Sequence, residues 1–230
     1  MNPVQFDIVN FFRIPLLAIM LITSHVVFSA ELSPQEVEQK ELSLALKYSL
    51  LSKPLPLKPF QLSDQNNKPF GLEALKGKWT FIYFGYTSCP DVCPTTIDEL
   101  NLVSKKLASD HRYDKDTQFV FVSVDPYRDT PDALKKFTAY FEFNLLGAVA
   151  PVEDLNILTD QLGVMHRRLI VQDRETKQQE YAVEHSSEIY LIDPQGSAMA
   201  KFSPPHYGNE IKKLYVKIRE MNEHKSAGGD

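Results

Sequence analysis

The sequence has little cysteine and no excess of positive charge. Its 230 residues include only two cysteines and carry a formal net charge of −5. Two cysteines are too few for the disulfide framework of a small secreted scaffold. Without a basic stripe, nucleic acid is not expected as a partner. There is also no internal repeat, no low-complexity segment and no Cys-x-x-Cys-His haem motif.

Long apolar runs are missing too, except at the N-terminus, where IPLLAIMLITSHVVFSA (14–30) follows Arg13. An apolar run next to a cation predicts an export signal or an uncleaved membrane anchor over residues 1–30. The run is shorter than the ~20 residues that span a bilayer, which favours cleavage. Phe28, which is bulky where a cleavage site before Ala30 needs a small residue, argues against it. In either case the rest of the chain is expected in the bacterial periplasm, exported or tethered to the inner membrane.

The remaining chain has the composition of one compact domain, since 43% of all residues are hydrophobic. We expect a linker over residues 31–58, part of it a short amphipathic helix, then a domain over 59–222 and a flexible tail over 223–230. Residues 53–60, with three prolines, are typical of an extended linker or an edge strand.

Within the domain, hydrophobic patterning predicts a β-hairpin at 60–72, with its turn at 64–68, before alternating strands and helices. The fold class is therefore α/β, with a central mixed β-sheet flanked by helices and an N-terminal hairpin extension. The expected strands are 78–87, 117–125, 164–172, 188–196 and 197–202, and the expected helices are 97–109, 130–141, 151–163 and 207–221.

Both cysteines lie in SCPDVCP, after a buried strand and before a helix, and each precedes a proline. A helix N-terminus favours thiolates, which act as nucleophiles or soft-metal ligands. The spacing of Cys89 and Cys93 is Cys-x-x-x-Cys, whereas thioredoxin-type redox pairs are Cys-x-x-Cys. In a helix their Cβ atoms would be ~5–6 Å apart, wider than the ~3.5–4.5 Å of a disulfide. The geometry favours a metal site without excluding a disulfide, and the helix is expected to start at Pro90 or Pro94.

A metal site needs a third ligand, and histidine is the natural candidate. His166 is expected to be an outward strand residue and His206 a surface-loop residue. His185 lies between two strand segments, where spacing alone favours a hydrogen-bonded turn histidine. The chain's histidines are His25, His111, His166, His185, His206 and His224.

Three segments, YFGYTSCPDVCPTT, FVSVDPYRDTPDALKKF and YAVEHSSEIYLIDPQG, together resemble the Sco/SenC family of copper-binding, thioredoxin-like proteins. The segments occur in the family's order along most of residues 60–221. The resemblance implies a thioredoxin-like fold and copper, as Cu(I) and Cu(II), held by Cys89, Cys93 and His185. Soft thiolates suit Cu(I), and an added imidazole suits Cu(II).

The resemblance also implies a function. It is copper delivery to the copper A centre of cytochrome c oxidase subunit II, or to another exported cuproprotein. Asp91, Asp125 and Asp129 are candidates for supporting the ligands or docking the partner. An Asp–Pro turn with an internal Arg–Asp pair that caps the next helix explains Asp125 and Asp129 about as well.

The alternative is a periplasmic thiol–disulfide reductase that uses Cys89 and Cys93 as a redox dithiol on the oxidase copper site or on other exported cuproproteins. The Cys-x-x-x-Cys spacing and the lack of a proline just before EIYLID argue against it. A peroxidase on the same scaffold is a third hypothesis. A binding protein is therefore favoured over an enzyme.

Overall fold

The computed structural model describes residues 33–90, 92–172 and 179–227 of the chain. The chain divides into two units, Met1–Val37 and Glu38–Asp230. The predicted signal or anchor over residues 1–30 lies outside the described residues. Within the described part, no helix has both the length and the apolar character that a bilayer crossing requires.

Helix α1 (Pro34–Ser49) confirms the short helix predicted after residue 31. It begins with a capping box, in which the Ser33 hydroxyl accepts a hydrogen bond from the Glu36 N–H at 3.3 Å. The Glu36 carboxylate accepts one from the Ser33 N–H at 2.8 Å. These bonds satisfy N–H groups that a helix start leaves without partners. The next residues form β1 (Leu50–Pro56), which is an edge strand, a position that tolerates prolines.

The Glu38–Asp230 unit is built on an eight-stranded mixed sheet in the order β1-β10-β9-β4-β5-β6-β2-β3. Central β4 (Trp79–Gly85) pairs in parallel with β5 (Thr117–Ser123) and antiparallel with β9 (Ile189–Ile192). Every residue of β4 is buried, as expected of a strand covered on both faces. The other strands are β2 (Gln61–Asp64), β3 (Pro69–Gly71), β6 (Leu145–Val149) and β10 (Ser197–Phe202), and β2–β3 is the predicted hairpin.

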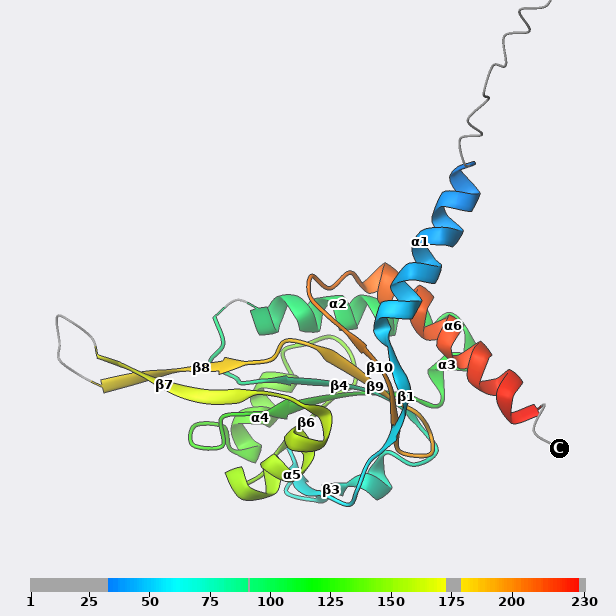
Figure 1. The fold of residues 1–230 in the computed structure, drawn as a ribbon. Helices are drawn as coiled ribbons and strands as arrows, with labels where there is room; N and C mark the ends of the chain where they lie inside the picture. The colour runs from blue at the N-terminus through cyan, green and yellow to red at the C-terminus, as the bar shows by residue number, and fades with distance from the viewer. Residues whose placement is uncertain (1–32, 91, 173–178, 228–230) are drawn as a thin grey trace, which may run out of the picture. The chain divides into compact units, whose positions relative to one another are not determined.

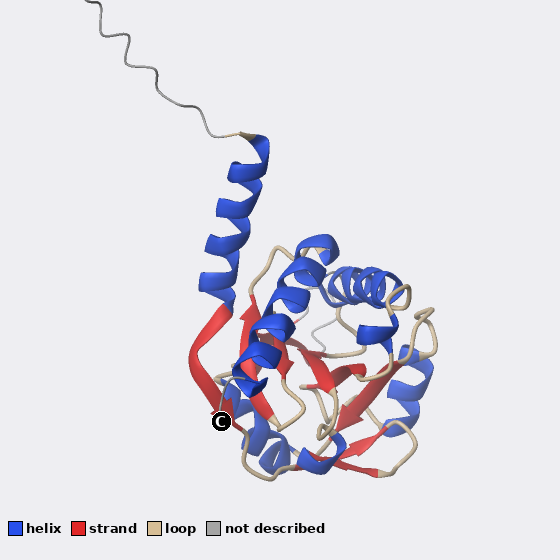
Figure 2. Ribbon diagram, turned by 90° about the vertical axis from the view of Figure 1, so that its right-hand side faces the viewer, coloured by secondary structure: helices blue, strands red, loops and turns tan. Residues whose placement is uncertain are grey.

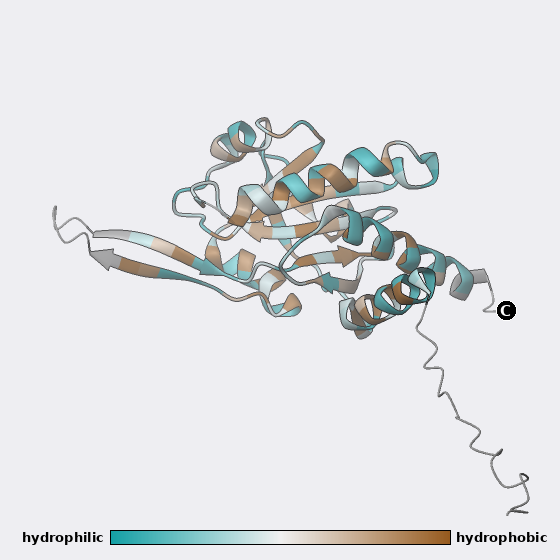
Figure 3. Ribbon diagram, turned by 90° about the horizontal axis from the view of Figure 1, so that it is seen from above, coloured by the Kyte–Doolittle hydropathy of each residue, from teal (hydrophilic) through white to brown (hydrophobic). Residues whose placement is uncertain are grey.

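Helices cover the sheet, with α2 above it and α5 below it in Figure 1, and Figure 2 shows the same layers from the side. Phe121 of β5 contacts Phe137 of α4 with ring centroids 4.9 Å apart. Phe81 of β4 contacts Tyr215 of α6 at 5.0 Å. Figure 3 shows apolar residues gathered on the central strands. The helices are α2 (Val92–Leu107), α3 (His111–Asp114), α4 (Pro131–Thr138), α5 (Val152–Leu162), α6 (Gly208–Ala227) and the short 3-10 helix η1 (Leu72–Ala74).

A separate two-stranded hairpin reaches out from one end of the sheet (Figure 1). It consists of β7 (His166–Gln172) and β8 (Gln179–His185), which pair antiparallel so that His166 lies opposite His185. Residues 173–178, which join the two strands, lie outside the described residues. The hairpin therefore brings His185 to its base, where β8 ends.

Several details differ from the sequence predictions. Helix α6 continues to Ala227, into the tail predicted to be flexible over residues 223–230. Helix α2 begins at Val92 rather than at Pro90 or Pro94. Pro94 fits there because the N–H groups of a first helical turn have no partner within the helix. Residues 145–149, for which no element was predicted, form β6. Gly147 and Ala148 are weak strand formers, so the strand depends on its pairing with β5.

Gly85 is the last residue of β4 and lies close to the Cys93 side chain of α2. A Cβ atom there would come within 2.7 Å of Phe121 Cε2 and 2.8 Å of Cys93 Sγ. We therefore expect Gly85→Ala to lower the free energy of unfolding by about 1–3 kcal/mol through overpacking. Urea denaturation would measure the change, and an unaltered midpoint would contradict this packing.

Candidate metal centre

The two cysteines lie on the connection between β4 and α2. The backbone N–H of Cys89 donates to the Tyr86 carbonyl at 3.1 Å, which closes a turn. Cys93 is the second residue of α2. The two are not joined by a disulfide. Cys93 is fully buried and Cys89 is 9% exposed, so Cys89 is the more accessible of the two sulfurs.

His185, at the end of β8, meets these sulfurs. Its Nε2 lies 3.6 Å from Cys93 Sγ, and the ligand atoms of Cys89, Cys93 and His185 all lie within 4.8 Å of one another. The Nδ1–H of His185 donates to the Ser186 carbonyl at 2.8 Å. This bond fixes the tautomer and leaves the Nε2 lone pair directed at the cysteines, as in metal-binding histidines. The structure thus brings together the three predicted ligands.

The buried hydroxyl of Tyr83 indicates that the site fits a metal. This hydroxyl makes no well-formed hydrogen bond among the described residues, although the Cys93 thiol and Thr96 lie beside it. The Tyr83 ring packs edge-on against His185, with centroids 6.4 Å apart. Burial, and then the neighbouring Cys93, raises the pKa of Tyr83, so the O–H remains a donor. A thiol sulfur is only a weak acceptor, and a metal-bound thiolate at Cys93 would accept this O–H more strongly.

Cys93 is a protonated thiol in the absence of metal. Its side-chain hydrogen bond with Cys89, followed by its burial, raises the pKa of the Cys93 thiol. Two thiols and an imidazole form a donor set suited to soft or borderline transition metals. A metal that binds here must therefore displace a proton from Cys93.

Asp129 supports the cysteine side of the site. Its carboxylate accepts hydrogen bonds from the Thr87 N–H at 2.9 Å, the Thr87 hydroxyl at 2.5 Å and the Ser123 hydroxyl at 2.6 Å. Thr87 lies two residues before Cys89, and Ser123 ends β5. Asp129 ties the loop that contains Cys89 to the end of the neighbouring strand, β5.

Asp125 and Arg128 support the histidine side. The buried Asp125 carboxylate pairs with Arg128 and accepts a hydrogen bond from the Tyr181 hydroxyl of β8 at 2.9 Å. The Arg128 guanidinium lies 4.0 Å from the Tyr181 ring centroid and 5.5 Å from that of Tyr86. The Arg–Asp pair expected in this turn is therefore present, and it also anchors the hairpin that ends in His185. Thr130 caps α4 by accepting a hydrogen bond from the Ala133 N–H at 3.2 Å.

A groove of about 780 Å³ opens beside the ligands. Cys89, Pro90 and Val92 line it from the helix side, and Met165 and His185 line it from the hairpin side. Met165 is 77% exposed at this groove. The groove gives another molecule access to Cys89, the more exposed of the two sulfurs.

Other predicted residues fall elsewhere. Asp91 lies outside the described residues. His166 is half-buried rather than outward, and its Nε2 lies 3.1 Å from Asn156 Oδ1. His206 is half-buried rather than a free surface residue, with Nε2 2.7 Å from the Ser187 carbonyl. Sequence reasoning missed Tyr83, Thr87, Tyr181 and the contact of His206, because no local pattern marks a contact made across the fold.

Replacing Asp129 tests its structural role. We expect Asp129→Ala to lower the free energy of unfolding by roughly 2–4 kcal/mol, because buried donors of Thr87 and Ser123 lose a charged acceptor. Urea denaturation measures this loss. Asp132→Ala, which removes an exposed carboxylate from the first turn of α4, is the matched control. It should cost less than about 1 kcal/mol. Equal losses in the two variants would contradict a special role for Asp129.

The raised pKa of Cys93 also predicts a pH dependence. We expect the apparent affinity for a thiophilic metal to increase with pH from about pH 6 to pH 9, with proton release on binding. The protonated thiol contributes folding stability that is fully present below the unfolded thiol pKa of about 8.5. That contribution to folding stability is lost as the pH rises toward the raised pKa of Cys93 in the folded protein. Competition titrations with a chelator at several pH values measure the affinity, and an affinity independent of pH would contradict the assignment.

Comparison with known proteins adds to this geometry. A model of the SCO1/SenC family matches residues 51–222. A SCO2-like protein of Rickettsia prowazekii is 35% identical over 157 residues, which are 68% of this chain and 74% of that protein. Copper-bound ScoI of Bradyrhizobium japonicum is 31% identical with a TM-score of 0.61, covering 72% of this chain and 98% of that structure. Copper-bound ScoI of Arabidopsis thaliana is 27% identical with a TM-score of 0.64, covering 71% and 98%. The predicted thioredoxin-like fold is confirmed.

Proposed function

This chain belongs to the SCO1/SenC family, and we propose that it binds copper through Cys89, Cys93 and His185. The observation that carries the proposal is the convergence of these three ligand atoms within 4.8 Å of one another. They lie in a fold shared with solved relatives that hold copper. Copper supplies a thiophilic ion that accepts two thiolates as Cu(I) and gains from an imidazole as Cu(II).

The protein residues have separate tasks in this function. Cys89 and Cys93 supply the sulfur ligands, and Cys93 loses its proton when copper arrives. His185 offers Nε2 because its Nδ1–H is used by the Ser186 carbonyl. Tyr83 supplies a buried O–H next to the Cys93 sulfur, where a thiolate can accept it. Asp129 and Asp125 hold the two halves of the ligand set in place.

We further propose that the protein delivers copper to the copper A centre of cytochrome c oxidase subunit II, or to another exported cuproprotein. The family resemblance supports this role, and so does the groove, through which the ligands of a partner can reach Cys89. The apolar N-terminal segment supports a location in the bacterial periplasm, exported or tethered to the inner membrane.

A thiol–disulfide reductase acting on the oxidase copper site or other cuproproteins is the second candidate. Its support is the pair of adjacent sulfurs, one of them accessible. The raised pKa of Cys93 argues against it, because the nucleophile in thiol–disulfide exchange is the thiolate. Cys89 would have to be the attacking sulfur.

Copper titration of the full-length chain tests the proposal. We expect one equivalent of Cu(I) to bind tightly to the wild type and to His185→Ala, since two thiolates suffice for Cu(I). We expect Cu(II) affinity to fall by at least about tenfold in His185→Ala, because the imidazole is lost. His111→Ala, at an exposed position of α3, is the matched control and should bind like the wild type.

The outcomes separate the two candidate functions. If the reduced protein binds no Cu(I) but reduces a disulfide substrate rapidly, the reductase hypothesis replaces the copper proposal. If Cu(I) binds tightly and His185→Ala leaves Cu(II) affinity unchanged, His185 is not a ligand although the protein binds copper.

A further inference from the structure

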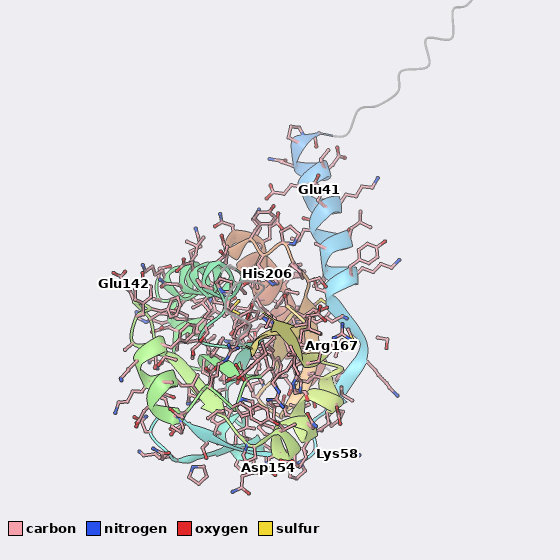
Figure 4. All side chains as sticks on the ribbon, turned by 90° about the vertical axis from the view of Figure 1, so that its left-hand side faces the viewer. Glu41, Lys58, Glu142, Asp154, Arg167 and His206 are labelled. Atoms are coloured by element: carbon pink, nitrogen blue, oxygen red, sulfur yellow. The ribbon has the colours of Figure 1, made fainter. Side chains whose placement is uncertain are left out.

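The loop before α6 contacts the segment that follows His185. His206, labelled in Figure 4, lies in this loop and is half-buried. Its Nε2 lies 2.7 Å from the Ser187 carbonyl oxygen. Because a carbonyl only accepts, Nε2 must carry the proton and donate it. His206 is thus bonded to the backbone two residues after a predicted copper ligand.

The segment that receives this bond is the short connection between β8 and β9. Its first residue, Ser186, provides the carbonyl that fixes the tautomer of His185. Ser186 is held from the hairpin side, where its N–H donates to the Met165 carbonyl at 2.8 Å and its hydroxyl accepts from the Met165 N–H at 3.0 Å. His206 holds the next residue from the opposite side of the connection.

The same loop is fixed to the helix that carries Cys93. The Gly208 N–H, at the start of α6, donates to the Glu99 carboxylate of α2 at 2.5 Å. A Cβ atom at Gly208 would lie 2.7 Å from the Glu99 carbonyl oxygen, so only glycine permits this approach. Residues 206–208 therefore link the helix of Cys93 to the connection after His185.

His206 is suited to a fixed, uncharged role. Burial lowers the pKa of His206, against the opposing influence of the Ser187 hydrogen bond and the Glu188 and Glu99 carboxylates. Its Nδ1 is buried and has no hydrogen-bond partner among the described residues. The neutral ring thus has one N–H, and that N–H is used to hold Ser187.

We propose that His206 is a positioning residue that sets how well the centre holds Cu(II) relative to Cu(I). The inference rests on the proposed copper function. The two thiolates come from the β4–α2 side and suffice for Cu(I), so a shift of the β8–β9 connection moves only the third ligand. Cu(II), which gains from the imidazole, is the state that responds.

Two amide substitutions form a matched test. The amide nitrogen of Gln reaches about as far as histidine Nε2, whereas that of Asn reaches only about as far as Nδ1. We expect His206→Gln to retain the Cu(II) affinity of the wild type and His206→Asn to lose about tenfold, with Cu(I) affinity unchanged in both. In the His185→Ala background, His206→Asn should cause no further loss of Cu(II) affinity, because His206 acts through His185. Competition titrations of the full-length chain measure all five proteins: the wild type, the three single variants and the double variant.

A readout without copper keeps this inference separate from the proposed function. In ¹⁵N-histidine NMR of the metal-free protein, His185 should be the Nδ1–H tautomer in the wild type and in His206→Gln. It should become a tautomer mixture in His206→Asn. An unchanged His185 tautomer in His206→Asn, or equal Cu(II) losses with and without His185, would overturn the positioning role. A wild-type protein that binds no copper would contradict the proposed function, whereas the tautomer result would still decide whether His206 positions His185.

Discussion

The carboxylate of Asp129 holds together the two strand ends on which the metal centre is built. It accepts two hydrogen bonds from Thr87, on the loop after β4, and one from Ser123, at the end of β5. It is only 2% exposed, so these bonds compete little with water. The position of Cys89 depends on them, because Thr87 lies only two residues before Cys89. One buried carboxylate thus fixes the loop that contains Cys89 at the C-terminal ends of β4 and β5.

His185 is held by a separate set of contacts, because it comes from a hairpin outside the main sheet. Asp125 and Arg128 hold that hairpin through Tyr181, and His206 holds the connection that follows it. The two sides meet with Cys93 Sγ and His185 Nε2 3.6 Å apart, although 92 residues separate them. Because the ligand atoms are already close together, metal binding needs to order fewer side chains and so loses less conformational entropy.

The protonation states of the site favour a ligand role over a nucleophilic one. Cys93 is buried and hydrogen-bonded to Cys89, so its thiol keeps its proton until a metal replaces it. Beside it lie a buried tyrosine O–H that makes no well-formed hydrogen bond and an imidazole with its lone pair directed inward. A metal-bound thiolate would accept the tyrosine O–H more strongly than a thiol does, and a metal would take the imidazole lone pair that now faces the Cys93 thiol. A catalytic thiol would need the opposite environment, one that stabilises the thiolate in the resting protein.

The sequence by itself determined the strands and helices whose patterns are local. The buried run of β4, the Thr130 cap and the hairpin turn at 64–68 all follow from neighbouring residues. It also identified Cys89 and Cys93 as candidate metal ligands and, through the family resemblance, His185 as the third. It did not determine β6, whose small residues form a strand only by pairing with β5, or the start of α2. Only the tertiary structure showed what Asp129, Tyr181 and His206 do, because hydrogen bonds across the fold leave no trace in the spacing of residues along the chain.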